Sequence, residues 1–449
     1  MRQLLGLTLF AMALRGQTAS DAEIRAMLAD RIDTLHQSVG IVVGIIDGSG
    51  RRYVSYGQMG LKDARPVGTD TVFEIGSTTK VFTSTILADM VRKGEVALDD
   101  PVAKYLPKEA KIPERGGKQI TLLDLATHSS GLPSLPSNLK PKDANNPYAD
   151  YTDAQLWEFL SGYQLTRDVG TKFQYSNLGV GLLGQALARR AGMDYEALVR
   201  ARVTGPLKME NTRIALTPAM KAHLAAGHTA TREPAENWDL PVFAGAGALR
   251  SDVRDMLTFV GAPLGYVQSP LAEAMASMTK VRRPAMGDME IGLAWIVPKA
   301  TEAHEIYWHN GGTGGYRTFM GYDAKTRVGV VVLSNMSTNV GVDDIGMHLL
   351  NPAAPLAKLP VLSAHKEIKL APEALEKYVG VYEFAPNVTL TVTREGGQLY
   401  AMLTGQPRFE VYPETERDFF LKVVDAQLTF DGDAVVLHQN GRDQRATKK

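Results

Sequence analysis

Apolar residues recur at helical spacing in two early segments, and a strand pattern lies between them. From Asp21 to His36 and from Ser77 to Lys93 the apolar positions fall on one helix face, and Gly94 ends the second segment. Between these segments, a β-branched run at 39–46 is followed, after a short turn, by a second strand pattern at 52–56. We expect two helices and a β-hairpin here.

The middle of the chain is rich in helical patterns, and strand patterns return after it. Helical spacing broken by proline and glycine extends from about Thr121 to Leu257. Four strand patterns and a closing helical pattern follow, at 291–297, 304–309, 316–322, 328–333 and 340–350. This order predicts an α/β sandwich, in which helices flank an antiparallel sheet and a helical subdomain is inserted between its two halves.

The C-terminal part of the chain carries a different pattern. Residues 351–370 contain three prolines and little periodicity, so we expect a linker there after a main domain at 21–350. From 371 to 449, short strand patterns alternate with turns. Short strands with frequent turns predict a small all-β barrel or sandwich.

The composition excludes several classes of function. The formal net charge is +0 and no long basic run occurs, so the chain lacks the electrostatic signature of a nucleic-acid-binding protein. The absence of cysteine excludes disulfides, thiolate catalysis, thiolate zinc sites and a lipoprotein anchor. A chain of 449 residues, 44% of them hydrophobic, is expected to form two or three domains with a sizeable core.

The N-terminus has the pattern of a secretory signal peptide. A basic start at Arg2 precedes an apolar run at 4–14, which fits an exported protein with a signal at 1–20. Cleavage after the small residues at 11–13 or within 16–20 is compatible with the pattern, and a frayed helix is the alternative interpretation. The run is too short to span a bilayer, so we expect export to a bacterial periplasm without a stable membrane anchor.

A serine and a lysine three residues apart open the second predicted helix. At this spacing Ser77 and Lys80 share a helix face, and a helix start favours negative charge. A lysine kept partly neutral by burial can accept the serine proton. The same Ser-x-x-Lys spacing recurs at Ser137, Ser277 and Ser363, but none of these serines opens a long amphipathic helix. We therefore place the candidate nucleophile at Ser77.

A second candidate element is Tyr175-Ser176-Asn177. A tyrosine close to two cations can lose its proton and act as a general base. An asparagine two residues later can hold a substrate carbonyl. The alternative is a buried tyrosine that is hydrogen-bonded to the backbone.

The third element is a glycine-rich segment that begins at His309-Asn310-Gly311-Gly312, directly after a predicted strand. Glycines beside an edge strand let a ligand approach the backbone closely. The N–H group of Gly312 could pair with that of Ser77 to form an oxyanion hole. A plain glycine-rich hairpin is the alternative.

Taken in this order, the three elements resemble the motifs of the class C serine β-lactamases and of the related penicillin-binding proteins and esterases. The first element resembles their Ser-x-x-Lys motif, the second their Tyr-x-Asn motif, and the third stands where those lactamases carry Lys-Thr-Gly. Flanking segments at 123–133, 206–209 and 292–295 agree, and the resemblance covers roughly residues 21–350. It implies a β-lactamase/DD-peptidase-like sandwich, and the C-terminal part resembles a lipocalin-like domain that is sometimes appended to such hydrolases.

The resemblance implies a role for each site residue. Ser77 would attack the carbonyl and form an acyl-enzyme, while Lys80 and Tyr175 would share the proton transfers. Asn177 would position the substrate amide, and the N–H groups of Ser77 and Gly312 would hold the oxyanion. The division of the proton between Lys80 and Tyr175 stays open at the level of sequence.

The sequence departs from the lactamase pattern at His309-Asn310. A lysine at the first position would attract a substrate carboxylate, whereas a histidine with an ordinary pKa of about 6.5 is mostly neutral at pH 7. We expect hydrolysis of an amide bond, in β-lactams or D-alanyl peptides, with short-chain ester hydrolysis as the alternative and a non-catalytic binding protein as a third. If His309 matters, carboxylate substrates should improve below about pH 6.5.

Two further motifs do not change this prediction. The glycines at 179–184 match a dinucleotide fingerprint, but no strand precedes them, so close helix packing is the better interpretation. His304 and Glu305 lack the second histidine of a zinc-protease motif. We therefore expect no metal and no organic cofactor, and a small-molecule or peptidoglycan-derived substrate.

Overall fold

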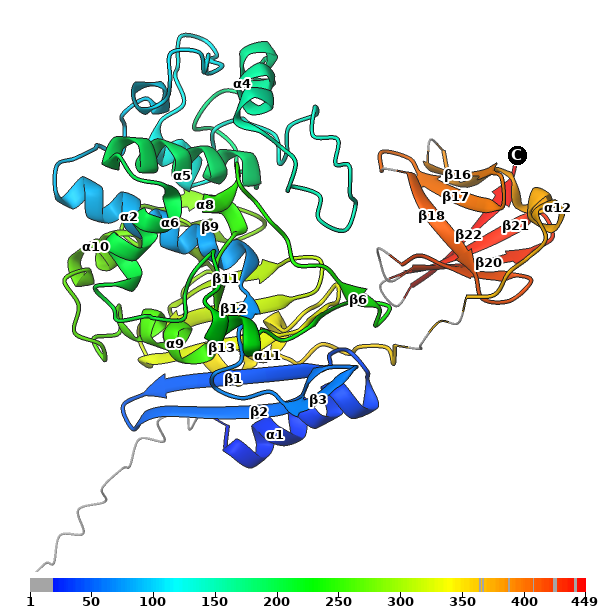
Figure 1. Ribbon diagram of the computed structural model, residues 1–449, viewed down its shortest axis with the longest axis horizontal. Helices are drawn as coiled ribbons and strands as arrows, with labels where there is room; N and C mark the ends of the chain where they lie inside the picture. Colours follow the sequence, from blue (N-terminus) through cyan, green and yellow to red (C-terminus); the bar gives the residue numbers. More distant parts are fainter. Residues whose placement is uncertain are drawn as a thin grey trace, which may run out of the picture.

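The computed structural model describes residues 19–362, 365, 367–386, 388–406, 408–422, 426–439 and 442–449. Its larger part is built on one antiparallel nine-stranded sheet, whose order places strands from both ends of the larger part side by side (Figure 1). From one edge to the other, the strands are β3 (Asp63–Pro66), β2 (Gly50–Gly60), β1 (Gly40–Asp47), β13 (Val328–Ser334), β12 (Arg317–Asp323), β11 (Ile306–Gly312), β10 (Ile296–Val297), β9 (Glu290–Ile291) and β8 (Arg283–Pro284).

Both faces of this sheet are covered. Along β1, Ile41, Val43 and Ile45 pack in one apolar cluster with residues of α1 (Asp21–Ala29) and α11 (Asp343–Leu350). The intervening residues Val42 and Ile46 join the larger cluster on the other face, which includes the helical region. Alternate side chains of a strand point to opposite faces, so a nearly continuous apolar run is what a sheet covered on both sides requires.

The helices of the second face come from the segment between β3 and β8, as the sequence predicted for an inserted helical subdomain. They are α2 (Thr79–Arg92), α3 (Leu122–Ala126), α4 (Asp153–Gly162), α5 (Asn177–Ala191), α6 (Tyr195–Val199), α7 (Pro218–Ala222), α8 (Ala244–Gly247), α9 (Val253–Gly261) and α10 (Ala272–Ser277). Two further small sheets lie in this part of the fold. One pairs β4 (Phe73–Glu74) with β7 (Arg250–Ser251), and the other places β5 (Gly227–Thr229) between β14 (Met336–Ser337) and β6 (Pro234–Ala235).

The glycines at 179–184 lie where α5 contacts α8. A Cβ atom on Gly184 would stand 2.9 Å from the Cα of Gly245, and one on Gly181 would stand 2.9 Å from the ring of Phe243. These glycines therefore allow the close packing of two helices.

The strand predicted at 291–297 is interrupted in the structure, which corrects the sequence-based expectation. Glu290–Ile291 and Ile296–Val297 are separate short strands. Between them, Ala294 has φ +64°, and its N–H group donates to Ala126 O at 3.1 Å, which turns the backbone out of the ladder. A left-handed residue cannot continue a strand.

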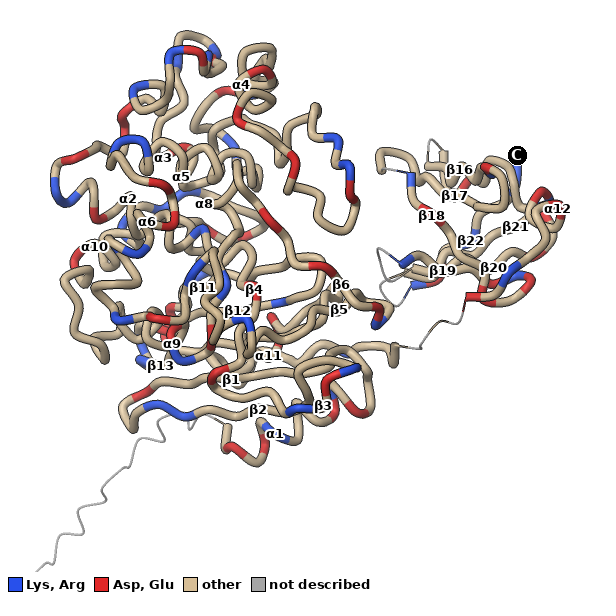
Figure 2. Tube along the Cα trace, viewed as in Figure 1, with Lys and Arg blue, Asp and Glu red and all other residues tan. Residues whose placement is uncertain are grey.

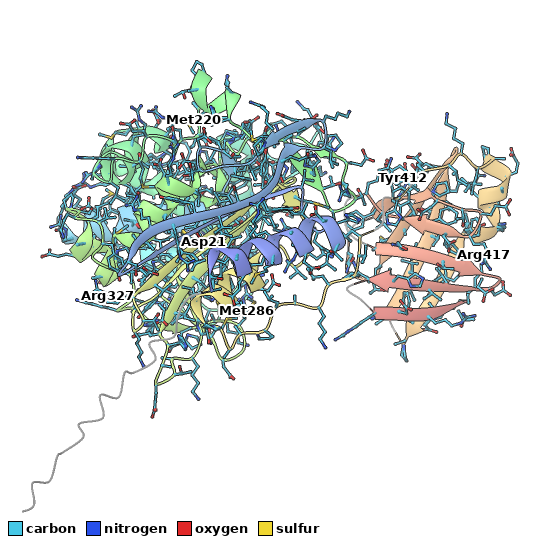
Figure 3. The ribbon with its side chains drawn as sticks, turned by 90° about the horizontal axis from the view of Figure 1, so that it is seen from below. Asp21, Met220, Met286, Arg327, Tyr412 and Arg417 are labelled. Atoms are coloured by element: carbon cyan, nitrogen blue, oxygen red, sulfur yellow. The ribbon has the colours of Figure 1, made fainter. Side chains whose placement is uncertain are left out.

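The C-terminal part is a closed eight-stranded barrel with its own apolar core, preceded by the short helix α12 (Pro372–Leu375). Its strands are β15 (Gly380–Ala385), β16 (Val388–Glu395), β17 (Gln398–Leu403), β18 (Arg408–Pro413), β19 (Asp418–Phe420), β20 (Ala426–Asp431), β21 (Ala434–Gln439) and β22 (Arg442–Lys448). Figure 3 shows the barrel beside the larger part, with the described side chains of both drawn as sticks.

The connecting segment packs on the larger part for most of its length. The N–H of Leu362 donates to Leu35 O at 2.9 Å, and Gln37 Nε2 donates to Pro360 O at 2.8 Å. The Leu362 side chain is buried with Val39 and Met336. The N–H of Ile368 bonds Pro413 O of the barrel.

Charges are interspersed over both parts, and Lys and Arg form no continuous stripe in Figure 2. No helix among the described residues has the length and apolar character needed to cross a membrane. The predicted signal peptide falls almost entirely outside the described residues.

Candidate active site

Ser77 lies in a single 3-10 turn (Gly76–Thr78) that leads directly into α2. Gly76 has φ +49°, and a Cβ atom there would stand 2.7 Å from Gly312 N, a separation that would force a displacement. Glycine is therefore required at this position for two reasons, conformation and space. This close approach places the backbone of Ser77 next to that of Gly312, the last residue of β11.

Lys80 lies one turn further along α2 and is 0% exposed. Its Nζ atom is 2.9 Å from Ser77 Oγ, 2.7 Å from Asn177 Oδ1 and 2.7 Å from Ala246 O. Three partners satisfy all three positions of the amino group. The lysine is thus held in a single orientation towards the serine.

Burial holds the pKa of Lys80 well below its usual value, because the charged form is desolvated there. A neutral amine has two N–H groups and one lone pair. Asn177 Oδ1 and Ala246 O can only accept hydrogen bonds, so the two N–H groups go to them. The lone pair then faces the Ser77 hydroxyl, which is the one partner that can donate.

Tyr175 completes this group from the loop before α5. Its ring centroid is 4.8 Å from Lys80 Nζ, and its hydroxyl is hydrogen-bonded to Ser77. Burial nevertheless raises the pKa of Tyr175, and the bond to Ser77 opposes this only partly. Burial therefore acts against the release of the phenol proton that the sequence-based expectation invoked, and Lys80, the neighbouring amine, is itself desolvated.

Asn177 is the first residue of α5, and its position follows from a helix cap. Ser176 caps the helix by accepting the N–H of Gly179 at 2.8 Å, and its own hydroxyl donates to Pro133 O at 2.6 Å. The Asn177 oxygen is used by Lys80, so its amide nitrogen is the atom left for a substrate carbonyl.

His309 points to the same side of β11 as the serine group, and it is buried. Its Nδ1 atom donates to Asn310 O at 2.6 Å. Burial lowers the pKa of His309 to about 3. His309 therefore remains neutral at physiological pH, and the predicted change near pH 6.5 is not expected from this residue.

Asn310 points to the opposite side of the strand. Its Nδ2 atom donates to Asp343 Oδ2 at 2.5 Å, at the start of α11. Burial raises the pKa of Asp343 to about 6. Gly311 returns to the inner side, where a Cβ atom would meet Ile75 O at 2.0 Å. The structure thus brings every predicted site residue to one region but separates the Asn310 side chain from the serine.

A narrow pocket of about 20 Å³ lies beside Ser77. Asn177 and Gly312 line it together with an aromatic wall. Within the wall, the rings of Tyr148 and Trp238 are 5.2 Å apart and those of Tyr148 and Phe243 are 6.0 Å apart. There is space for a methyl-sized group next to the nucleophile. No sequence motif indicated this wall, because its residues come from separate loops.

Sequence reasoning also missed His128, which lies against Tyr175 with ring centroids 4.5 Å apart. Its flanking segment was noted, but a single histidine in a loop carries no local pattern that marks it as part of a site. No group of three or more potential ligands that could hold a metal ion occurs among the residues that the structure describes.

Comparisons with known proteins agree with this geometry. The family model Beta-lactamase matches residues 24–350, and a domain of unknown function (DUF3471) matches residues 364–438. The chain is 31% identical to the D-alanyl-D-alanine-carboxypeptidase/endopeptidase AmpH of Escherichia coli (strain K12), over 69% of this chain and 82% of that protein. A penicillin-binding protein of Bacillus subtilis (strain 168) is 26% identical over 94% of this chain and 97% of its own length.

Among solved structures, a Beta-lactamase/D-alanine Carboxypeptidase from Yersinia pestis, complexed with citrate, aligns with a TM-score of 0.63 at 26% identity. It covers 76% of this chain and 100% of its own. The family model thus matches most of the chain, and the chain has the fold of these relatives. The chain belongs to the Beta-lactamase family, and it is a serine hydrolase that works through an acyl-enzyme.

Proposed function

We propose that this protein hydrolyses the amide bond of D-alanyl peptides, with Ser77 as the nucleophile. The observation that carries the proposal is the fully buried Lys80, whose Nζ atom lies 2.9 Å from Ser77 Oγ and whose pKa burial lowers. The relative named as a D-alanyl-D-alanine carboxypeptidase/endopeptidase supports the choice of substrate class.

In the proposed acylation step, Ser77 Oγ forms a bond to the substrate carbonyl carbon while its proton passes to Lys80 Nζ. The N–H groups of Ser77 and Gly312 stabilise the oxyanion. The protonated Tyr175 hydroxyl relays a proton to the leaving amine and is reprotonated from Lys80. Water then attacks the ester of Ser77, its proton returns along the same route, and the acid product leaves.

The narrow pocket favours a small substituent next to the reacting carbonyl. The pocket of about 20 Å³ beside Ser77 matches the methyl group of an alanyl residue more closely than the bulky acylamino side chain of many β-lactams. We therefore expect β-lactams to acylate Ser77 more slowly than alanyl peptides do.

A second candidate is short-chain ester hydrolysis, which a different observation favours. With His309 neutral and Lys80 buried and paired, neither residue offers a cation for a substrate carboxylate. An ester without a carboxylate needs no ion pair for binding. The carboxylate of a D-alanyl substrate, in contrast, finds no cation to pair with at this site.

Parallel assays separate the two candidates. The wild type and Ser77→Ala are compared on a diacyl-lysyl-D-alanyl-D-alanine peptide, on p-nitrophenyl butyrate and on nitrocefin. Ser77-dependent release of D-alanine supports the first proposal. Ser77-dependent ester turnover without D-alanine release would replace it with the second candidate, and turnover that persists in Ser77→Ala would contradict both.

We further propose that residues 1–20 act as an export signal and that 371–449 is a separately folding domain. The basic start and apolar run at the N-terminus support export, and the separate barrel core supports the domain. N-terminal sequencing of protein secreted from a bacterial host tests the signal. Recovery of the intact N-terminus at Met1 would contradict it.

A further inference from the structure

Tyr175 is held from both sides by His128. The carbonyl of His128 accepts the N–H of Gln174 at 2.7 Å, and its Nδ1 atom accepts the N–H of Ser176 at 3.1 Å. The two bonds flank Tyr175 in the chain, and the His128 ring packs on the phenol ring. His128 has φ +54°, a conformation that is unusual for histidine and is retained where the surroundings enforce it.

These contacts fix the tautomer of His128. An Nδ1 atom that accepts a hydrogen bond carries no proton, and burial keeps the pKa of His128 well below its usual value. The ring is therefore neutral, with its proton on Nε2. That Nε2 atom is buried and has no hydrogen-bond partner among the described residues.

His309 has the opposite tautomer. Its Nδ1 atom carries the proton donated to Asn310 O, so its Nε2 atom has a free lone pair, and this atom is also buried and unpartnered within the described part of the chain. Both rings lie beside Tyr175, and His309 is among the groups that act on the pKa of His128. The His309 ring lies 6.4 Å from that of Tyr175. One unpartnered donor and one unpartnered acceptor thus lie beside the same tyrosine.

We propose that a single buried water bridges this histidine pair, and that His128 is a positioning residue for Tyr175. The water accepts from His128 Nε2 and donates to His309 Nε2, which satisfies both buried atoms. With both rings fixed, the phenol hydroxyl stays directed at Ser77. The kinetic consequence rests on the proposed role of Tyr175, whereas the tautomers and the water do not.

Substitutions at His128 separate its two hydrogen-bonding nitrogens. His128→Asn retains an acceptor near the position of Nδ1 but loses the Nε2 donor, and His128→Ala loses both. We expect kcat to fall about 100-fold in the alanine variant and about 10-fold in the asparagine variant, with KM changed less. The control is His228→Asn, at a buried histidine that bonds Asn335 O away from the site. Equal kcat losses in all three variants would contradict positioning.

Imidazole ¹⁵N spectra of the full chain test the tautomers without any turnover. We expect His128 to carry its proton on Nε2 and His309 on Nδ1, with neither ring titrating between pH 5 and 8. Spectra of His128→Gln and His309→Gln assign the signals. Identical tautomers, or titration of either ring in that range, would overturn the bridged pair even if the proposed peptidase activity were confirmed.

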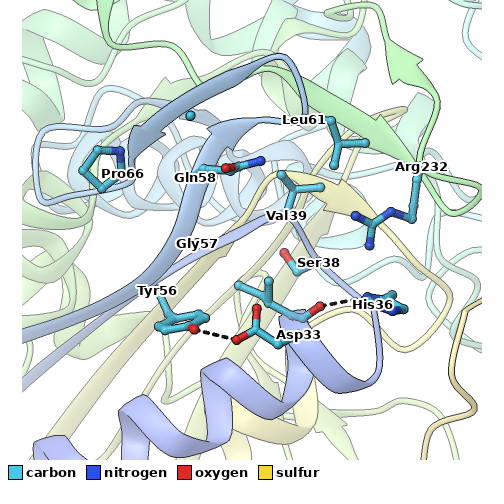
Figure 4. Close-up of a pocket in the computed structure, with 12 residues that line it drawn as sticks. Asp33, His36, Ser38, Val39, Tyr56, Gly57, Gln58, Leu61, Pro66 and Arg232 are labelled. Carbon is cyan, nitrogen blue, oxygen red and sulfur yellow. Dashed lines mark hydrogen bonds between the residues drawn. The ribbon is translucent and has the colours of Figure 1, made fainter.

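A pocket of about 460 Å³ lies at the edge of the sheet that carries β2 and β3 (Figure 4). The lining includes no residue of the serine group. Arg232, from the turn between β5 and β6, reaches over it. Its Nη1 atom is buried without a hydrogen-bond partner in the described structure, and burial lowers its pKa.

Arg232 forms no ion pair among the described residues. Asp33 is the one carboxylate in the lining, and the Tyr56 hydroxyl donates to it at 2.5 Å. The remaining walls are mixed: Ile32, Val39 and Leu61 form an apolar part beside polar residues such as Ser38 and Gln58. An anion beside Arg232 would offset the cost of a partly buried guanidinium.

We infer that this pocket binds a small organic carboxylate with an apolar body, whose carboxylate bonds the Arg232 guanidinium. Calorimetric titration of the full chain with sodium benzoate tests the site, with benzamide as the uncharged probe. We expect binding of benzoate but not of benzamide, weakened at least 10-fold in Arg232→Gln. The matched control is Arg65→Gln, which removes a nearby exposed arginine paired with Asp63. Equal weakening in both variants, or no benzoate binding to the wild type, would overturn the inference.

Discussion

At the scale of single residues, the chemistry depends on which atoms carry protons. The sequence was sufficient to place Ser77, Lys80, Tyr175 and Asn177 in one site, because each lies in a short motif. It could not assign the proton, because the pKa of Lys80 depends on burial by segments as distant as Ala246. Desolvation also explains why His309 is neutral well below pH 6.5.

Replacing the base without adding bulk should abolish turnover. Lys80→Met removes the lone pair but retains the length of the side chain. We expect kcat/KM to fall by at least about 1,000-fold, because a removed general base and the lost contact to Ser77 act together. Lys93→Arg, at an exposed residue just beyond the same helix that pairs with Asp89, is the control and should retain full activity. Substantial turnover by Lys80→Met would exclude Lys80 as the base.

Asp343, rather than His309, should control how activity on carboxylate substrates varies with pH. Its pKa is raised to about 6, so Asp343 is ionised above that pH. Asp343 lies behind β11, where Asn310 bonds it, and from there its negative charge opposes the binding of a substrate carboxylate on the serine side. Arg317 and Asp344 are its other charged neighbours. As the pH falls through 6 and Asp343 is protonated, kcat/KM for a carboxylate substrate relative to a neutral ester should rise a few-fold. In Asp343→Asn, this ratio of kcat/KM values should not change with pH. An unchanged pH dependence in that variant would contradict this assignment.

At the scale of elements, strands with an apolar pattern could be predicted and strands without one could not. β13 was predicted within one residue because all its side chains are buried. β22 (Arg442–Lys448) was missed, because Ala446 is its single buried residue and its sequence has no alternation. The interruption at Ala294 depends on a bond to α3, which is remote in sequence.

The 3-10 turn that carries Ser77 should tolerate no Cβ at Gly76. Gly76→Ala would place a methyl group 2.7 Å from Gly312 N and would separate the two halves of the oxyanion hole. We expect kcat to fall at least 100-fold, about the effect of losing one oxyanion donor. Gly94→Ala is the matched control, because Gly94 has φ +69° but no atom within 4 Å. Equal losses in both variants would show that backbone strain, rather than the contact, is responsible.

At the scale of the whole molecule, two separate apolar cores predict two separable parts. The barrel core contains residues from 375 onwards, and the described residues of the larger part form their own clusters. The sequence predicted a linker at 351–370 from its prolines, but it could not reveal that Leu362 packs against Val39 and Met336. Leu362 and Val39 lie more than 300 positions apart in the chain, and no local sequence pattern indicates a contact between them.

Truncation should therefore be tolerated after Leu362 but not after Leu350. A chain that ends at 362 retains the buried leucine and the bonds to Leu35 and Gln37. A chain that ends at 350 loses them, at a cost of about 2 kcal/mol for the leucine alone. We expect the shorter chain to have a lower Tm in thermal unfolding, and the longer one to match the Tm of the main domain in the full protein. Equal Tm values would contradict the packing of this segment.

The most direct test of the central claim is intact-mass spectrometry of the protein after incubation with benzylpenicillin, followed by peptide mapping. We predict one covalent adduct with the mass of the intact drug, located on Ser77 and absent from Ser77→Ala. The adduct should form in Asp343→Asn as well. No adduct on the wild type, or an adduct that persists in Ser77→Ala, would contradict an acyl-enzyme formed on Ser77.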